Sequence, residues 1–458
     1  MTASTTSIAK PGADAFVAAF ELALPSLPGQ GVAWLDRLRQ GGIERFRDLG
    51  LPGAKVEDWK YTRLRPLEDT AYRPVAATDG SAAVDHLPTL FPDAAVARIV
   101  FVNGCLRDDL TRLSGLPKGV TVESLGQAVA RDSEWVERHL GRVAVAENRS
   151  LLALNTAMMN SGVVIRVARN VAVETPIEVV YVAGLTDQPV AYYPRNLIVL
   201  EEGAAATIVK HYAGIGVGAY FANSVSEISV GANARLRHYR VQTESMEATH
   251  LGALHVRVGR DATYETFGLS AGGRLSRNEC LVRLEGEGAH CGVNGAYLMK
   301  GREHCDNTTL IEHTVPHTTC REVFKGVLDD EARGVFQGKI VVHKDAQKTD
   351  GQMLTKTLLL ADGAEMDAKP ELEIYADDVK CSHGATSGRL DETALFYLRS
   401  RGIPEALARN LLVRSFVAEA IAEVSDLAVR EALADIVVHK LPAQCYLAEE
   451  WTREGGAA

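Results

Sequence analysis

A short turn motif recurs six times between residues 200 and 364, and it limits what this chain can fold into more than any other feature. Each copy has an aliphatic residue, two to four turn-forming residues and then an alanine. The copies are LEEGA at 200–204, VGANA at 230–234, VGRDA at 258–262, LEGEGA at 284–289, LDDEA at 328–332 and LADGA at 360–364. The intervals between the final alanines of consecutive copies are similar, except for one longer interval from Ala289 to Ala332. A period of about 30 residues predicts a stacked array whose units bury their apolar sides only against one another.

The segments between these turns alternate apolar and polar residues from Val163 onward, as in VVIRVA, IEVVYVA, NLIVLE and LHVRVG. Such alternation between turn residues is typical of many short strands. We therefore expect a mainly β fold with a β-helix (β-solenoid) core over residues 161–388. A β-sandwich is the structural alternative, since it also has evenly spaced short strands. The longer step of the motif predicts one enlarged coil somewhere in 290–331.

The regions on either side of this core have a different pattern. Residues 1–160 combine helical patterns at 13–48, 133–141 and 146–159 with two short strand patterns in 98–124, which indicates a mainly helical α/β region. Residues 389–458 have the spacing of two or three helices. Because a stacked array has two open ends that need covering, we expect these helical regions to cap them.

Composition excludes several classes of function. The chain has 458 residues, a formal charge of −10 and no dense run of Lys and Arg, so it offers no basic face to nucleic acid. No apolar run approaches the ~18 residues of a membrane-spanning helix. The seven cysteines are widely spaced and odd in number, which argues against a disulfide framework and for a reducing compartment. We expect a cytoplasmic protein.

Cys381 and His383 lie in the segment KCSHG, where the strand pattern ends and the helical pattern begins. We expect them on a short loop that follows the last strand, EIYADDV. Residues two apart on extended chain face the same side, so both side chains could bind one metal. Two ligands do not complete a four-ligand site, and any metal would need further ligands from elsewhere. From spacing alone, a packed cysteine beside a structural histidine is the simpler interpretation.

A second group of soft ligands lies between residues 290 and 320. It comprises His290, Cys291, His304, Cys305, His313, His317 and Cys320. The HTVPHTTC segment has a spacing that suggests zinc, but the Cys-x2-Cys half of a zinc motif is missing. A zinc-stabilised structural protein therefore remains one alternative. The other is that stacked strands simply bring these residues into register.

Motifs of the common enzyme classes are absent from the sequence. It has no G-x-x-x-x-G-K-[ST] phosphate loop, no G-x-G-x-x-G after a strand, no G-x-S-x-G elbow and no H-E-x-x-H. We therefore expect a scaffold without an ATP site of its own rather than an enzyme. A carbohydrate-active β-helix enzyme is the alternative, and it would need carboxylates clustered on one face of the solenoid.

Long segments of the chain resemble the SufB/SufD family of iron–sulfur cluster assembly proteins. They are GVFQGKIVVHKDAQKTDGQMLTKTLLL at 334–360, AEMDAKPELEIYADDVKCSHGATSGRLDETALFYLRSRGI at 364–403, KVEDWKYTRLRPL at 55–67 and LLALNTAMM at 151–159. The resemblance extends from about residue 35 to about residue 430. Within the family, the KCSHGATSG form is similar to the SufD branch rather than the SufB branch.

The resemblance implies a β-helix that pairs with SufB along its edge and binds the SufC ATPase through its C-terminal helices, or forms a homodimer when SufB is absent. It further implies that a transient iron–sulfur cluster is built at the SufB–SufD interface, and that a reduced flavin on the complex is the electron source. His383 matches the family histidine implicated at that interface, and Cys381 matches its neighbouring cysteine.

Overall fold

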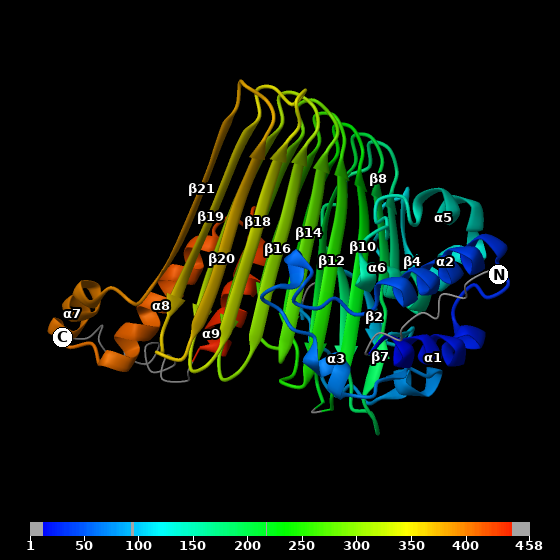
Figure 1. The fold of residues 1–458 in the computed structure, drawn as a ribbon, viewed down its shortest axis with the longest axis horizontal. Helices are drawn as coiled ribbons and strands as arrows, with labels where there is room; N and C mark the ends of the chain where they lie inside the picture. The colour runs from blue at the N-terminus through cyan, green and yellow to red at the C-terminus, as the bar shows by residue number, and fades with distance from the viewer. Residues whose placement is uncertain (1–11, 93–95, 217, 442–458) are drawn as a thin grey trace, which may run out of the picture.

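The computed structural model describes residues 12–92, 96–216 and 218–441, and these form a β-solenoid with helices on its outside (Figure 1). The chain passes back and forth between two facing sheets, so that each coil adds one strand to either sheet. The expected mainly β fold with a solenoid core is confirmed, and the β-sandwich alternative is wrong. Pairing between consecutive coils is parallel throughout, whereas a sandwich would be built from antiparallel strands.

Sheet A begins at the end of the solenoid that is reached last in the sequence. Its strands lie in the order β20 (Glu365–Ile374), β18 (Arg333–Val342), β16 (His304–His313), β14 (Leu275–Leu284), β12 (Ala248–Val258), β10 (Tyr220–Val230), β8 (Arg195–Leu200), β5 (Val163–Val167) and β4 (Val120–Ser124), with β7 (Val190–Tyr192) and β1 (Arg73–Pro74) attached beside β10. Within this sheet, only β4 is antiparallel to its neighbour among the described strands.

Sheet B faces sheet A along the whole solenoid. Its order is β21 (Lys380–Gly388), β19 (Asp350–Leu359), β17 (Thr319–Leu328), β15 (His290–Met299), β13 (Thr263–Ser270), β11 (Arg235–Thr243), β9 (Ala205–Gly214), β6 (Ile177–Ala183), β2 (Ala97–Val102) and β3 (Cys105–Leu106). The two sheets thus end together, at β20 and β21 on one side and at β4, β2 and β3 on the other (Figure 1).

A residue in the left-handed conformation lies in each turn from sheet A to sheet B between β5 and β19, and this explains most copies of the repeated turn. The series is Asn170, Gly203, Asn233, Asp261, Gly288, His317 and Lys348, all with φ between 55° and 75°. Gly, Asn and Asp adopt this conformation at the least steric cost, which accounts for most of the series. Their backbone N–H groups also bridge successive coils, as from Asn233 to the carbonyl of Arg260. The turn is therefore favoured both by the conformational preference of its own residues and by hydrogen bonds between stacked coils.

The prediction of an enlarged coil in 290–331 is wrong. After Ala289, the next residue at the same position in the turn is Thr318, because Thr319 N donates to Ala289 O just as His290 N donates to Ala262 O. The LDDEA and LADGA motifs instead form the opposite turn, from sheet B back to sheet A. The register between strands confirms nearly equal coils: the shortest step pairs Thr249 with Leu275, and the longest, between β5 and β8, pairs Val164 with Leu197.

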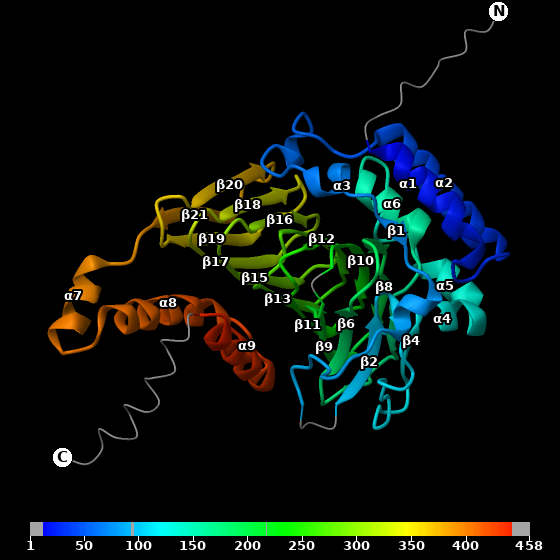
Figure 2. The same cartoon turned by 90° about the horizontal axis from the view of Figure 1, so that it is seen from below.

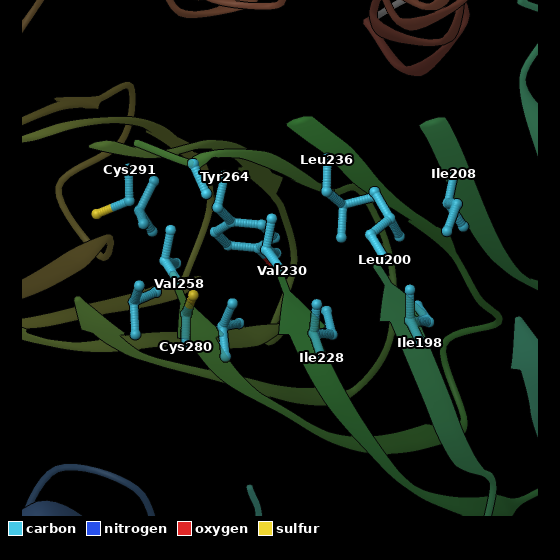
Figure 3. Packing of buried hydrophobic residues seen from close by; sticks show 14 of the residues in the cluster. Ile198, Leu200, Ile208, Ile228, Val230, Leu236, Val258, Tyr264, Cys280 and Cys291 are labelled. Carbon is cyan, nitrogen blue, oxygen red and sulfur yellow. The ribbon is translucent and has the colours of Figure 1, made fainter. Parts of the chain in front are cut away.

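The interior between the sheets is a continuous apolar core. Ile198, Ile228 and Val230 contribute from sheet A, and Ile208, Leu236 and Tyr264 contribute from sheet B (Figure 3). Because successive strands are in register, residues on the inner face stack in columns along the solenoid. One column in sheet B runs Leu236, Tyr264, Cys291, Cys320, Gly351 and Cys381.

The helices cover the outer faces of the sheets (Figure 2). The prediction that the two terminal regions cap the ends therefore holds only at the first end, where β2, β3 and the connection to β4 pack against the interior core. On sheet A, α1 (Ala13–Ala23), α2 (Ala33–Leu49) and α6 (Ser150–Met158) pack against outward side chains such as Phe221. On sheet B, α8 (Glu405–Ile421) and α9 (Leu427–Lys440) pack against outward side chains such as Val241 and Val327. Both faces of each sheet are apolar at these coils, and the outer face needs cover as much as the inner one.

Shorter helices complete the described chain: α3 (Arg65–Asp69), α4 (Leu125–Arg131), α5 (Ser133–His139) and α7 (Glu392–Ser400). The segment between α2 and α3 crosses the outer face of sheet A, where Trp59 is buried with the Arg277 guanidinium 4.1 Å from its ring centroid. Across residues 12–441, apart from the gaps, no helix is long and apolar enough to cross a membrane.

Candidate functional site

Cys381 and His383 lie within β21, the last strand of sheet B, and not on the loop expected after the last strand. The segment EIYADDV contains the end of β20 and the turn that follows it, so one further strand comes after it. In β21, Cys381 pairs in register with Gly351 of β19, and His383 pairs with Met353. No described strand pairs with the other edge of β21. The two candidate ligands are therefore on an edge strand at the end of the solenoid.

Cys381 points toward the solenoid interior and is half-buried against the core. Burial is the main reason that its pKa is raised, and the nearby Cys320 and Asp350 add to the effect. Gly351 separates it from the next thiol of the column: a Cβ at Gly351 would lie 3.6 Å from Cys381 Sγ and 3.3 Å from Cys320 Sγ. A thiol with a raised pKa is a poor ligand by itself, but a bound metal ion would favour its thiolate.

His383 is exposed and lies on the same face of β21 as Cys381. The predicted common orientation of the two side chains is thus supported by the strand geometry. Across the mouth of the solenoid, the inner face of β20 is apolar and carries Met366, Leu372 and Ile374. The last coil therefore presents one thiol and one imidazole beside an apolar surface.

Among the described residues, no three His, Cys, Asp or Glu side chains are grouped so that they could hold a metal ion. This finding includes the seven residues between 290 and 320. Strand alternation and the two-sheet arrangement separate them: His290 and Cys291 are on β15 of sheet B, whereas His304 and Cys305 are on β16 of sheet A. The zinc-stabilised alternative therefore has no site in this region, and Cys381 with His383 would need ligands from outside the described residues.

The carbohydrate-enzyme alternative required carboxylates clustered on one face. Carboxylates do follow one another on the outer face of β20, but basic side chains of β18 pair with them, as in Arg333–Asp367 at 2.6 Å and Lys339–Glu373 at 2.6 Å. The acidic residues of β20 therefore form ion pairs on the polar outer face of a strand at the end of its sheet.

Three residues of the group between 290 and 320 do lie close together, although their spacing in the sequence did not predict it. Cys291 and Cys320 pair in register on β15 and β17, and His313 Nε2 is 3.2 Å from Cys320 Sγ. The separation of the two cysteines in the sequence nearly equals one coil of about 30 residues. A separation of about one coil length between two cysteines is therefore the sequence signal that could have predicted this pair.

Exposed aromatic side chains mark a second surface near the same end. Phe396 and Tyr397 of α7 are 67% and 56% exposed, and α7 lies beyond the last coil, away from both sheets (Figures 1 and 2). Neighbouring aromatic residues with this much exposure are unusual on a surface that stays in water.

Comparison with known proteins assigns nearly the whole described chain to one family. Residues 183–416 match the family model of the SUF system FeS cluster assembly SufBD core domain, and residues 13–179 match that of the SufBD protein N-terminal region. An iron–sulfur cluster assembly SufBD family protein of Synechocystis is 32% identical over 390 residues, 83% of this chain and 85% of its own length.

Two further relatives are named iron–sulfur cluster assembly protein SufD. The one from Escherichia coli is 31% identical over 88% of this chain and 92% of its own length. The one from Bacillus subtilis is 28% identical over 90% of this chain and 95% of its own length. The chain therefore belongs to the SufBD family of iron–sulfur cluster assembly proteins.

Proposed function

We propose that this chain is a non-catalytic scaffold subunit of the Suf machinery that pairs with SufB through the open end of its solenoid. The observation that carries the proposal is the exposure of the last coil: no residue of β20 or β21 is fully buried. Both strands offer a free edge at the same place, and a strand edge pairs readily with another chain. A second solenoid placed end to end would extend both sheets and cover the apolar mouth. When SufB is absent, we expect the same edges to pair with a second copy.

Pro370 supports the assignment of β20 as a strand that ends its own sheet. It lies in the middle of the strand, opposite Gly338 of β18. Proline cannot donate to a ladder, and within sheets it is found at edges. A partner strand on β20 would therefore be held mainly by the residues on either side of Pro370 and by the apolar inner face.

The proposed cargo of this interface is a nascent iron–sulfur cluster bound by Cys381 and His383 together with groups of SufB. The incomplete ligand set supports a shared site, because the last coil supplies two soft ligands beside the edge where SufB would bind. The reduced flavin implied for the complex and the cytoplasmic location remain predictions.

The C-terminal helices are the proposed binding surface for the SufC ATPase. The packing of α8 and α9 on sheet B fixes their inner faces, and Lys325 of β17 forms an ion pair with Glu419 of α8. Phe396 and Tyr397 are left exposed beside them, and aromatic residues are enriched where proteins bind each other. ATP hydrolysis would then belong to the partner, consistent with the missing phosphate loop.

The cluster site is tested by anaerobic reconstitution of the purified SufB–SufC complex of this chain. We expect His383→Ala to lower the iron and sulfide bound per complex at least severalfold while the complex still forms. His343→Ala is the matched control, because His343 is also a partly exposed histidine of the last coils. Equal iron and sulfide in both variants would contradict the ligand role, and loss of the complex in His383→Ala alone would make the role structural.

The SufC surface is better tested by surface substitution than by deletion, because removing α8 and α9 would uncover apolar residues of sheet B. We expect Phe396→Asp with Tyr397→Asp to weaken SufC binding at least tenfold and to leave SufB pairing unchanged. Leu22→Asp on α1, where Leu22 is 78% exposed, is the control. Unchanged SufC affinity in the double variant would refute this surface.

A further inference from the structure

Two cysteines that lie one coil apart in the sequence stack on each other inside the solenoid. Cys291 of β15 and Cys320 of β17 are in-register neighbours on the inner face of sheet B, and both are fully buried free thiols. Figure 3 shows Cys291 beside Tyr264, its neighbour in the preceding coil. Neighbouring strands lie about 4.8 Å apart, which is within the Cα separation that a disulfide spans.

His313 is placed to take the proton of Cys320. Its Nδ1 lies 2.7 Å from Thr318 Oγ1, and that hydroxyl donates its one hydrogen to the carbonyl of Val315 at 3.3 Å. Thr318 Oγ1 therefore accepts from Nδ1–H, which leaves Nε2 without a hydrogen in the neutral ring. This bare nitrogen lies 3.2 Å from Cys320 Sγ.

The two thiols differ in their readiness to ionise. The hydrogen bond from Cys291 lowers the pKa of Cys320 although burial opposes it, and His313 and the backbone N–H of Gln352 act in the same direction. The same hydrogen bond, together with burial, raises the pKa of Cys291. Glu322, on the same inner face, is buried, and this burial raises its pKa well above the usual range and favours its neutral form. Cys320 is thus the nucleophile and Cys291 the resolving thiol.

Gly351 separates Cys320 from the open end of the solenoid. A Cβ there would lie 3.3 Å from Cys320 Sγ and 3.6 Å from Cys381 Sγ, so no side chain of the column lies between the two sulfurs. A small oxidant that passes the half-buried Cys381 would next meet Cys320. Cys381 itself is two coils from Cys320, about twice the ~4.8 Å spacing, which is too far for a disulfide without backbone movement.

We propose that Cys291 and Cys320 form an oxidisable dithiol whose substrate is hydrogen peroxide, and that they close to a disulfide inside the solenoid. The Cys320 thiolate attacks one peroxide oxygen, the O–O bond breaks, and the leaving hydroxide takes the proton held by His313. Cys291 then attacks the resulting sulfenic acid, the S–O bond breaks, and the hydroxide leaves as water with the proton of Cys291. Two thiols and one peroxide give one disulfide and two waters.

The test uses the full-length chain, reduced, treated with hydrogen peroxide at pH 7, then unfolded in N-ethylmaleimide and digested without reductant. We expect mass spectrometry to find a peptide pair joined through Cys291 and Cys320. Cys280 and Cys305 are the internal controls, because both are buried thiols of sheet A whose in-register neighbours are not cysteines. They should remain labelled by N-ethylmaleimide.

Three results would overturn the proposal. They are equal labelling of Cys291, Cys320, Cys280 and Cys305; over-oxidation of Cys320 with Cys291 still labelled; and a disulfide from Cys320 to Cys381. Among variants, Cys291→Ser should leave a sulfenic acid on Cys320 that dimedone traps, and His313→Gln should slow disulfide formation roughly tenfold or more. Cys305→Ser should not change the rate. Because cluster assembly is not measured, the outcome is independent of the proposed function.

Discussion

The two ends of the solenoid differ in how their terminal strands are covered. At the first end, all residues of β2 are buried, and the interior core is packed against Leu106 of β3 and against Leu113 and Leu116 of the connection to β4. At the last end, β20 and β21 contain no fully buried residue. Each coil of a stacked array buries its apolar side only against neighbours. The first end is therefore completed by its own chain, whereas no described part of the chain covers the last end.

The difference also appears in how charged groups are held. Near the first end, Arg195 and Glu227 form an ion pair at 2.6 Å with neither side chain exposed, and Glu227 also accepts from the backbone N–H groups of Gly141, Val143 and Ala144. At the last end, Lys339 of β18 and Glu373 of β20 pair at the same distance with both side chains partly exposed. Equal distances do not imply equal energies, because removing one partner of a buried pair leaves an unpaired charge in the core.

The largest expected effect follows from that contrast. Glu227→Ala should lower the free energy of unfolding by about 3–5 kcal/mol, since it strands the Arg195 guanidinium and three backbone donors. Glu373→Ala, the matched change at the open end, should cost less than about 1 kcal/mol. Urea unfolding of the isolated chain measures both. Similar costs for the two variants would show that the two ends of the solenoid are equally solvated.

The second effect is a dependence of stability on pH that comes from the covered coils. Burial lowers the pKa of His255 to about 4, and that of His211 also to about 4, against an ordinary value near 6.5. Below pH 6.5 the unfolded chain binds protons that the folded chain cannot, so the free energy of unfolding should fall from pH 6.5 down to about pH 4. The loss approaches ~3 kcal/mol for each histidine.

His255→Gln should flatten this pH profile, because it removes one of the two histidines that burial keeps neutral. Unfolding curves at pH 4.5, 5.5 and 7 would measure the slope. An unchanged slope in His255→Gln would mean that this histidine is not held neutral by burial.

The smallest effect tests whether the last coil is uncovered in solution. Ile228→Ala, at a fully buried core position, should cost about 3 kcal/mol, and Leu372→Ala, half-buried in β20, about 1 kcal/mol. Adding SufB should raise the cost of Leu372→Ala, because the partner would bury that side chain. A cost for Leu372→Ala that already equals the cost of Ile228→Ala in the isolated chain would show that a second copy covers the mouth.

Several features of the fold could be predicted from local residues. The alternation from Val163 onward and the repeated turn were enough for a solenoid, because both reflect short-range chain preference. The same local reasoning failed at the turn after β16, where HTVPHTT replaces the motif and His317 takes the left-handed conformation that Gly or Asp takes elsewhere. The motif LDDEA then resembled the missing copy although it lies on the opposite turn.

The candidate site shows the same division. The segment KCSHG and its resemblance to the SufBD family identified Cys381 and His383, but their place on an edge strand rather than a loop depended on whether a further coil stacks after EIYADDV. The helices were predicted as helices, but their position on the faces of the sheets depended on the outward apolar residues of strands far away in the sequence, such as Phe221 and Val327.

The sequence by itself determined that the chain stacks in coils of about 30 residues, because a repeated turn at that period can bury its apolar side only by stacking. It also determined that a cysteine and a histidine with candidate ligand atoms follow the last repeated turn. These properties depend on residues close together in the chain.

Only the tertiary structure decided which end stays open and which cysteines become neighbours. Cys291 meets Cys320, and Gly351 lies between Cys320 and Cys381, because hydrogen bonds between successive coils set the register. A shift of one residue in that register would turn each of these side chains to the opposite face.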